Sequence, residues 1–132
     1  MKRVKIFKFK KNDVVDLTHT PEFGCNVIQC GKDKYTLTDY KPQEGHDDSL
    51  PYSAILCLNN QPICKCLNDG WGGSTELTPV DIRAKAVMAS ADITLSKFKW
   101  SFRTTEMHLT LDFIADTLAI SRDHEIKSLE KK

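Results

Sequence analysis

The chain has 132 residues, of which 40% are hydrophobic and 28% are charged, and its formal net charge is +1. This length suits one domain over residues 1–132, and the composition excludes collagen-like, fully disordered and disulfide-knot proteins. The near-neutral charge excludes a histone-like polycation, and no apolar run approaches the roughly 18 residues that span a bilayer.

The N-terminal sequence and the cysteines indicate a cellular compartment. Basic residues run through the apolar ones in MKRVKIFKFKKND, so the uninterrupted apolar stretch of a signal peptide is missing. We therefore expect a cytoplasmic protein. Its odd number of cysteines favours reduced thiols packed in the core, at Cys25, Cys30, Cys57, Cys64 and Cys66.

Alternating side chains predict strands in the first part of the chain. Residues 4–9 indicate a lysine-rich strand at or near a sheet edge, where lysine discourages further pairing. Residues 12–24 read as a loop. Residues 25–30 and 35–38 predict a hairpin, and the polar residues 41–51 predict another loop.

A second hairpin is predicted from the most apolar segment of the chain. Residues 52–58 and 63–67 are its two strands, and Asn59 and Asn60 between them tolerate the positive φ of a tight turn. Pro62 cannot donate a ladder hydrogen bond, so its nitrogen should face away from a neighbouring strand. The glycine-rich loop 68–74 follows.

A helix is predicted over about residues 79–95. Thr78 is a suitable cap and Pro79 is tolerated at the first helical position. Apolar residues at helical spacing suggest close packing of this helix onto the sheet, in one stripe of Ile82, Ala86, Ala89 and Ile93 and in a second of Val80, Ala84, Val87 and Ala91.

The C-terminal quarter of the sequence is harder to interpret. Residues 98–102 fit a fifth strand or an extended linker. Residues 106–113 fit either a strand or a helix, and the following run favours a helix over about 106–120. Residues 121–132 either fray or continue that helix. We therefore expect an α+β fold, with an antiparallel sheet of four or five strands and two helices of the C-terminal half on one face.

Charge is distributed unevenly along the sequence. Residues 1–11 contain six basic side chains and no acidic one, whereas residues 12–50 contain eight acidic and three basic side chains. Such a chain can present one positive and one negative surface. The acidic loop with Glu44, Asp47 and Asp48 is a candidate site for a basic partner protein, although solvated loops also contain such residues.

The loop 68–74 is a second candidate for partner binding. Its three glycines match neither a Walker loop nor the dinucleotide fingerprint. Trp71, beside Asp69, either plugs the core or anchors a contact with a partner, a role that tryptophan often plays.

Basic and aromatic residues alternate in two segments, which suggests single-stranded nucleic acid as an alternative ligand. Lysines would meet the phosphates and aromatic rings would stack on the bases, although lysines also keep edge strands soluble. The residues concerned are Lys5, Lys8, Lys10, Lys99, Trp100 and Arg103.

Metal binding and catalysis are weakly indicated. Cys64 and Cys66 share one strand face and Cys57 lies on the partner strand, which would suit zinc if three or four thiols met. No C-x-x-C pair is present, so core packing is the favoured interpretation. A Cys–His nucleophile pair has no local support, and we expect neither a cofactor nor enzymatic activity.

The segment Ile55–Gly73, in which a hairpin leads into Asn-Asp-Gly-Trp-Gly-Gly, resembles small proteins of phages and mobile elements. The resemblance implies a small cytosolic protein encoded by a mobile element. It further implies a protein that binds a host protein, in its sharpest form an inhibitor of a nucleic-acid-targeting defence system. No catalytic residues come with this resemblance.

Overall fold

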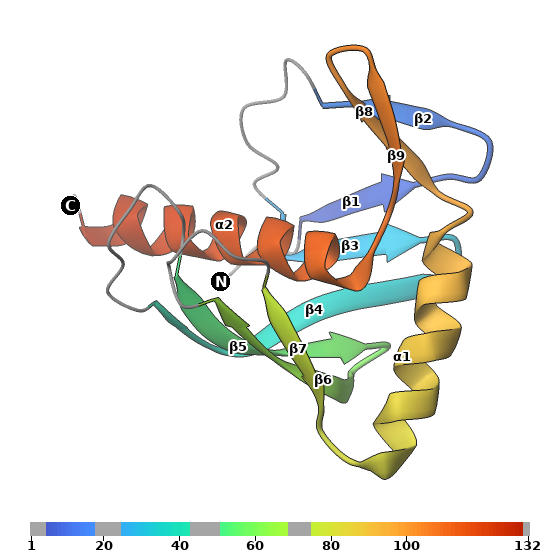
Figure 1. Cartoon of the computed structure of the whole chain (residues 1–132). Coiled ribbons are helices and arrows are strands. Elements are labelled where there is room, and N and C mark those ends of the chain that lie inside the picture. Colours follow the sequence, from blue (N-terminus) through green and yellow to red (C-terminus); the bar gives the residue numbers. More distant parts are fainter. Residues whose placement is uncertain (1–4, 18–24, 43–50, 69–74, 131–132) are drawn as a thin grey trace.

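A computed structural model describes residues 5–17, 25–42, 51–68 and 75–130 (Figure 1). Within these ranges no helix is long and apolar enough to cross a membrane. The elements in chain order are β1 (Ile6–Phe9), β2 (Val14–Asp16), β3 (Val27–Cys30), β4 (Asp33–Pro42), β5 (Tyr52–Leu58), β6 (Gln61–Asn68), β7 (Glu76–Pro79), α1 (Ile82–Leu95), β8 (Lys99–Phe102), β9 (Thr105–His108) and α2 (Leu111–Glu130).

The strands form two sheets, and the fold is α+β as predicted. The larger sheet has six strands in the order β1-β3-β4-β5-β6-β7, and the smaller has three in the order β2-β8-β9. The prediction of an antiparallel sheet of four or five strands is wrong, because β1 pairs with β3 and β2 pairs with β8 in parallel. Strand β2 lies in residues 12–24, which were expected to form a loop. It pairs with β8 in the small sheet, and this departure of the chain from the large sheet allows β1 and β3 to run in the same direction.

Both predicted hairpins are present. Strands β3 and β4 pair through a turn in which Gly31 has φ 62°, a conformation that favours glycine. Strands β5 and β6 pair through Asn59 and Asn60, with φ 51° and 68°. The lysine-rich β1 lies at the predicted sheet edge.

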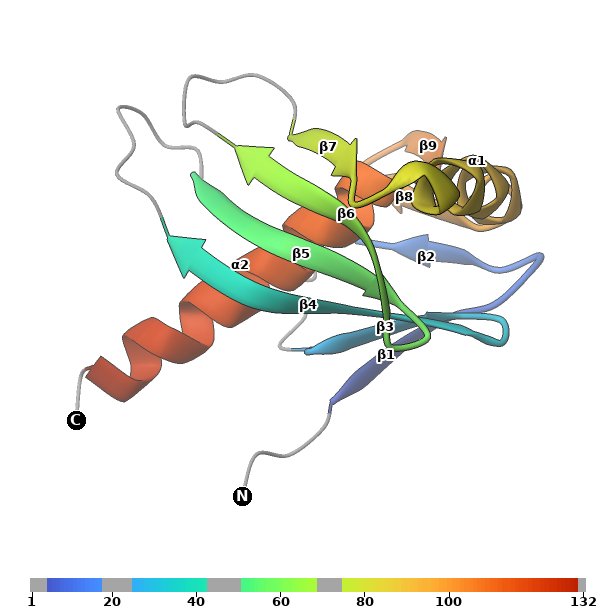
Figure 2. The ribbon, with the colours of Figure 1, turned by 90° about the horizontal axis from the view of Figure 1, so that it is seen from below.

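One face of the large sheet carries the core. Figure 2 shows α2 running across the strands on this face, with α1 beside it at the border of the molecule. Inward side chains of β3–β6 and of both helices form one buried cluster, in which Tyr35, Leu56, Cys64 and Ile114 are fully buried. All five cysteines are buried and unbridged, as expected of core thiols.

Helix α1 begins later than predicted. Pro79 ends β7, which is an edge strand and therefore tolerates proline. The cap is Asp81, whose carboxylate accepts a hydrogen bond of 2.8 Å from the Ala84 amide. Asp81 replaces the expected Thr78 because a cap must stand immediately before the first helical residue, here Ile82.

One of the two apolar stripes expected to pack on the sheet points outward instead. Its four residues are exposed, Ile82 by 88% and Ile93 by 67%. The buried residues of α1 are Ala84, Ala91 and Leu95, on the opposite side of the helix. The prediction of packing therefore holds only for part of the second stripe, namely Ala84 and Ala91.

The helix predicted from residue 106 is wrong at its N-terminal end. Residues 105–108 form β9, which pairs with β8, so the alternating interpretation of this segment is the correct one. Helix α2 begins only after Thr110, whose hydroxyl accepts a hydrogen bond of 3.3 Å from the Phe113 amide. At the other end α2 continues to Glu130.

Candidate functional site

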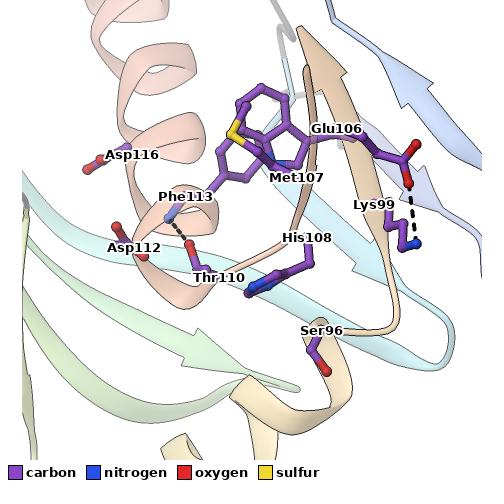
Figure 3. A pocket seen from close by; sticks show the side chains of 10 residues that line it. Ser96, Lys99, Glu106, Met107, His108, Thr110, Asp112, Phe113 and Asp116 are labelled. Atoms are coloured by element: carbon purple, nitrogen blue, oxygen red, sulfur yellow. Dashed lines mark hydrogen bonds and ion pairs between the residues drawn. The ribbon is translucent and has the colours of Figure 1, made fainter. Parts of the chain in front are cut away.

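A cavity of about 670 Å³ lies between the β8–β9 hairpin, the C-terminal end of α1 and the first turns of α2 (Figure 3). We call it the hairpin pocket. Residues of β8, β9 and α2 line it, together with Ser96 and Thr110 from the joining segments: Ser96, Lys99, Trp100, Glu106, Met107, His108, Thr110, Asp112, Phe113 and Asp116.

Aromatic and sulfur-containing side chains form one wall of the hairpin pocket. The rings of Trp100 and Phe113 stack at 4.6 Å between centroids with an interplanar angle of 23°. Met107 lies directly opposite Trp100 in the β8–β9 register, and Figure 3 shows Met107 next to Phe113. The Thr110 cap fixes the start of α2 and thereby the position of Phe113.

Two carboxylates stand one helical turn apart on α2 and also line the pocket. Asp116 Oδ1 accepts a hydrogen bond of 2.9 Å from the Tyr52 hydroxyl and a second bond from the Thr75 hydroxyl. Asn68 donates in turn to Thr75 Oγ1 at 3.2 Å. Both hydroxyls reach the same oxygen of Asp116, so this network holds the carboxylate in one orientation beside Asp112.

Burial is the main influence on the titration of this network. It raises the pKa of Asp116, the Thr75 and Tyr52 hydrogen bonds lower it, and the nearby Asp112 charge raises it. Burial and Asp116 together raise the pKa of Tyr52, so its hydroxyl stays a proton donor. A cation brought to Asp112 and Asp116 would relieve their repulsion.

The remaining polar groups leave the pocket lining acidic. Lys99 Nζ forms an ion pair with Glu106 Oε1 at 3.3 Å, and both side chains are about half exposed. His108 Nδ1 lies 3.1 Å from the Leu109 carbonyl oxygen. With both aspartates ionised, one lysine faces three carboxylates among the lining residues, so a cationic ligand is favoured over an anionic one.

The Asp116 network also has a structural role. Further along α2, Asp123 accepts a hydrogen bond of 3.4 Å from the Tyr40 hydroxyl, and the Tyr40 and Tyr52 rings stack at 5.8 Å. Burial, with Asp123 nearby, raises the pKa of Tyr40 to about 12. Two tyrosines of the sheet thus hold two aspartates of α2, and only Asp116 of the pair lines the pocket.

The partner-binding residues predicted from the sequence fall outside the described part of the chain. They are Trp71, Asp69, Glu44, Asp47 and Asp48. Their roles stay predictions.

The residues of the nucleic-acid alternative are divided between the two sheets. Lys5, Lys8 and Lys10 are exposed along the edge strand β1, whereas Lys99 and Trp100 lie on β8. Trp100 is stacked on Phe113 and Lys99 is paired with Glu106. Arg103 lies between β8 and β9, with its guanidinium 5.5 Å from the Phe102 ring centroid. The Glu106 carboxylate beside Lys99 disfavours phosphate at that point.

Charges mix around the small sheet. A cavity there is lined by Asp13 and Glu106 together with Lys97 and Lys99. Of the eight acidic residues in the predicted sorting of charge, four lie outside the described residues: Glu22, Glu44, Asp47 and Asp48.

The buried cysteines do not form an evident reactive site. Burial raises the pKa of Cys25 and raises that of Cys30 to about 12, so both thiols stay protonated and weakly nucleophilic. A hydrogen bond with Cys64, together with burial, raises the pKa of Cys66. Within the described ranges, no three metal-ligating side chains of His, Cys, Asp or Glu gather into a site.

Comparisons with protein-family models, curated proteins and solved structures found no match to this chain. The chemistry of its own residues is therefore the basis for assigning a function.

Sequence reasoning found Lys99 and Trp100. It missed Phe113, which stacks on Trp100, and the carboxylates of Asp112 and Asp116, which line the same pocket. Two signals were present. Asp112 and Asp116 are spaced by one helical turn, and alternation over residues 105–108 fits a hairpin with the preceding strand. The helix predicted from residue 106 concealed the hairpin, because it placed Met107 and Phe113 on one element.

Proposed function

We propose that the protein is a non-enzymatic binding protein that holds a basic segment of a partner protein in the hairpin pocket. The observation that carries this proposal is that the stacked Trp100–Phe113 pair lines one cavity together with the carboxylates of Asp112 and Asp116. Aromatic faces attract cations, and carboxylates accept their hydrogen bonds. A cavity with both groups suits a cationic side chain.

Arginine suits this arrangement better than lysine. Its flat guanidinium stacks on aromatic rings and donates two parallel hydrogen bonds to a carboxylate. Asp116 is already oriented by Tyr52 and Thr75, so its geometry needs little adjustment on binding. Arginine would also draw Asp116 into its ionised form, which its burial disfavours.

The sharper form of the proposal concerns the identity of the partner. The resemblance of Ile55–Gly73 to phage and mobile-element proteins supports a host protein in the cytoplasm, specifically a nuclease of a nucleic-acid-targeting defence system. Such proteins expose basic residues to meet phosphates, which is the kind of segment that the pocket would take.

An NMR titration tests the proposal. The probe is an acetylated, amidated peptide with one arginine flanked by glycines, and its control replaces arginine by citrulline, which has a similar shape and no charge. The arginine peptide is expected to shift the indole signal of Trp100 and the amide signals of 112–116. Asp112→Asn should weaken this response about tenfold, whereas Asp39→Asn, at an exposed residue of β4, should leave it unchanged.

Two outcomes would contradict the proposal. One is an equal response to the citrulline peptide, which would show that charge plays no part. The other is displacement of the arginine peptide by short single-stranded DNA at Trp100, with affinity that falls steeply as salt rises. That result would support the nucleic-acid alternative with Lys99 and Trp100.

A further inference from the structure

The outer side of α1 carries an apolar stripe that the fold leaves uncovered. Ile82, Ala86, Ala89 and Ile93 lie along one line of the helix, and the two isoleucines are 88% and 67% exposed. The sheet-facing residues Ala84, Ala91 and Leu95 lie on the opposite side. In Figures 1 and 2, α1 stands at the border of the molecule.

The spacing of the stripe is that of a helix-pairing seam. Steps of four, three and four residues are the alternating d and a positions of a heptad. In an antiparallel pair each d position meets an a position of the other helix. Ile82 of one copy would then meet Ile93 of the other, and Ala86 would meet Ala89, so the stripe is complementary to itself.

The charges that flank the seam are also self-complementary. Lys85 and Asp92 are both exposed and occupy the g positions beside the stripe. In the antiparallel register set by the isoleucines, g positions face g positions, so Lys85 of each copy would face Asp92 of the other. A two-fold axis would generate this contact twice. A parallel pair would instead place Ile82 against Ile82.

We infer that α1 is the contact surface for a second copy of this chain, as a two-fold antiparallel helix pair. A pair of 14-residue helices buries less than the roughly 800 Å² per partner of a standard interface. The dimer is therefore a weak one that forms at high protein concentration. Two copies would present two hairpin pockets in a fixed geometry, although the inference does not depend on what those pockets bind.

Charge exchange on α1 tests the contact. In sedimentation equilibrium, the mass should rise from 15.0 kDa toward twice that value as protein concentration increases. Lys85→Asp and Asp92→Lys, each alone, should raise the dissociation constant about tenfold because like charges then face each other. The double variant should restore it. Lys41→Glu, at an exposed residue of the C-terminal end of β4, which lies across the sheet from α1 in Figures 1 and 2, should leave it unchanged.

Cross-linking tests the orientation. A mixture of Ile82→Cys and Ile93→Cys proteins should form a mixed disulfide-linked dimer faster than either variant forms one alone. Residues 82 of two antiparallel copies lie roughly 16 Å apart along the axis. Wild-type protein under the same oxidant controls for its buried cysteines. A wild-type mass that stays at 15.0 kDa at millimolar concentration, or a double variant as weak as the single ones, would overturn the inference.

Discussion

The two helices use their apolar residues in different ways. In α2, Leu111, Ile114, Leu118 and two alanines are all buried against the sheet. In α1, three small or medium residues are buried, and the larger Ile82 and Ile93 face outward. Apolar residues surround α1, so its pattern does not select a face, whereas the acidic and basic residues of α2 leave it one apolar face. The contrast shows that apolar content alone does not orient a helix on a sheet.

The largest expected difference between the helices is in side-chain truncation. Ile114→Ala should lower the free energy of unfolding by about 2–5 kcal/mol, because Ile114 is fully buried and its loss leaves a cavity. Ile93→Ala should change it by less than about 0.5 kcal/mol. Urea unfolding, with the protein dilute enough to be monomeric, measures both values. Equal losses of unfolding free energy in the two variants would show that another part of the chain covers Ile93 in solution.

The bonds between tyrosines and α2 should differ in strength. Tyr52→Phe removes a 2.9 Å hydrogen bond to Asp116 and should cost about 1–2 kcal/mol. Tyr40→Phe removes a 3.4 Å bond to Asp123 and should cost less. Urea unfolding compares the two variants. A larger loss for Tyr40→Phe would mean that α2 is held mainly at its C-terminal half.

The cap of α1 offers a third comparison. Asp81→Ala removes the acceptor of the Ala84 amide and should lower the free energy of unfolding by about 1 kcal/mol. Asp81→Asn keeps an acceptor in place and should retain most of that stability. If thermal unfolding shows the same loss for both variants, the contribution of Asp81 is its charge at the helix N-terminus rather than the hydrogen bond.

The smallest expected effect is a dependence on pH from Asp116. Its folded pKa is raised above the ordinary value of 3.8, so the folded protein holds this proton more tightly than the unfolded chain. Protonated Asp116 therefore stabilises the folded state fully at pH values below its ordinary pKa, and this stabilisation is lost as the pH rises through the folded pKa. Asp116→Asn keeps the acceptor oxygen and should remove this decline. A wild-type decline that persists in the variant would assign it to another group.

Local patterns predicted the hairpins, and long-range pairing explains the errors. Glycine and asparagine favour the positive φ that the two turns require, so the β3–β4 and β5–β6 hairpins could be predicted from the sequence. Strand β2 has only three residues and pairs with β8, more than eighty positions away. No local signal specifies such a partner, and the parallel pairing of β1 with β3 depends on the same excursion of the chain.

The candidate site was less predictable than the fold. Its aromatic stack joins β8 to α2, and its aspartate is held by hydroxyls of Tyr52 and Thr75, far away in the sequence. Sequence spacing brings Asp112 and Asp116 together on the predicted helix. It does not reveal that Trp100 stacks on Phe113 and shares a pocket with them, because that arrangement depends on how the β8–β9 hairpin folds over α2.

The preference of the hairpin pocket for a positive charge is the most direct test of its assignment. The measurement is the ratio of affinities for the arginine and citrulline peptides, determined by NMR titration for the wild type and for the variant carrying both Asp112→Asn and Asp116→Asn. The ratio should be about tenfold or more in the wild type and close to one in the variant. A wild-type ratio near one, or an unchanged ratio in the variant, would contradict the assignment of the pocket as a site for a basic partner.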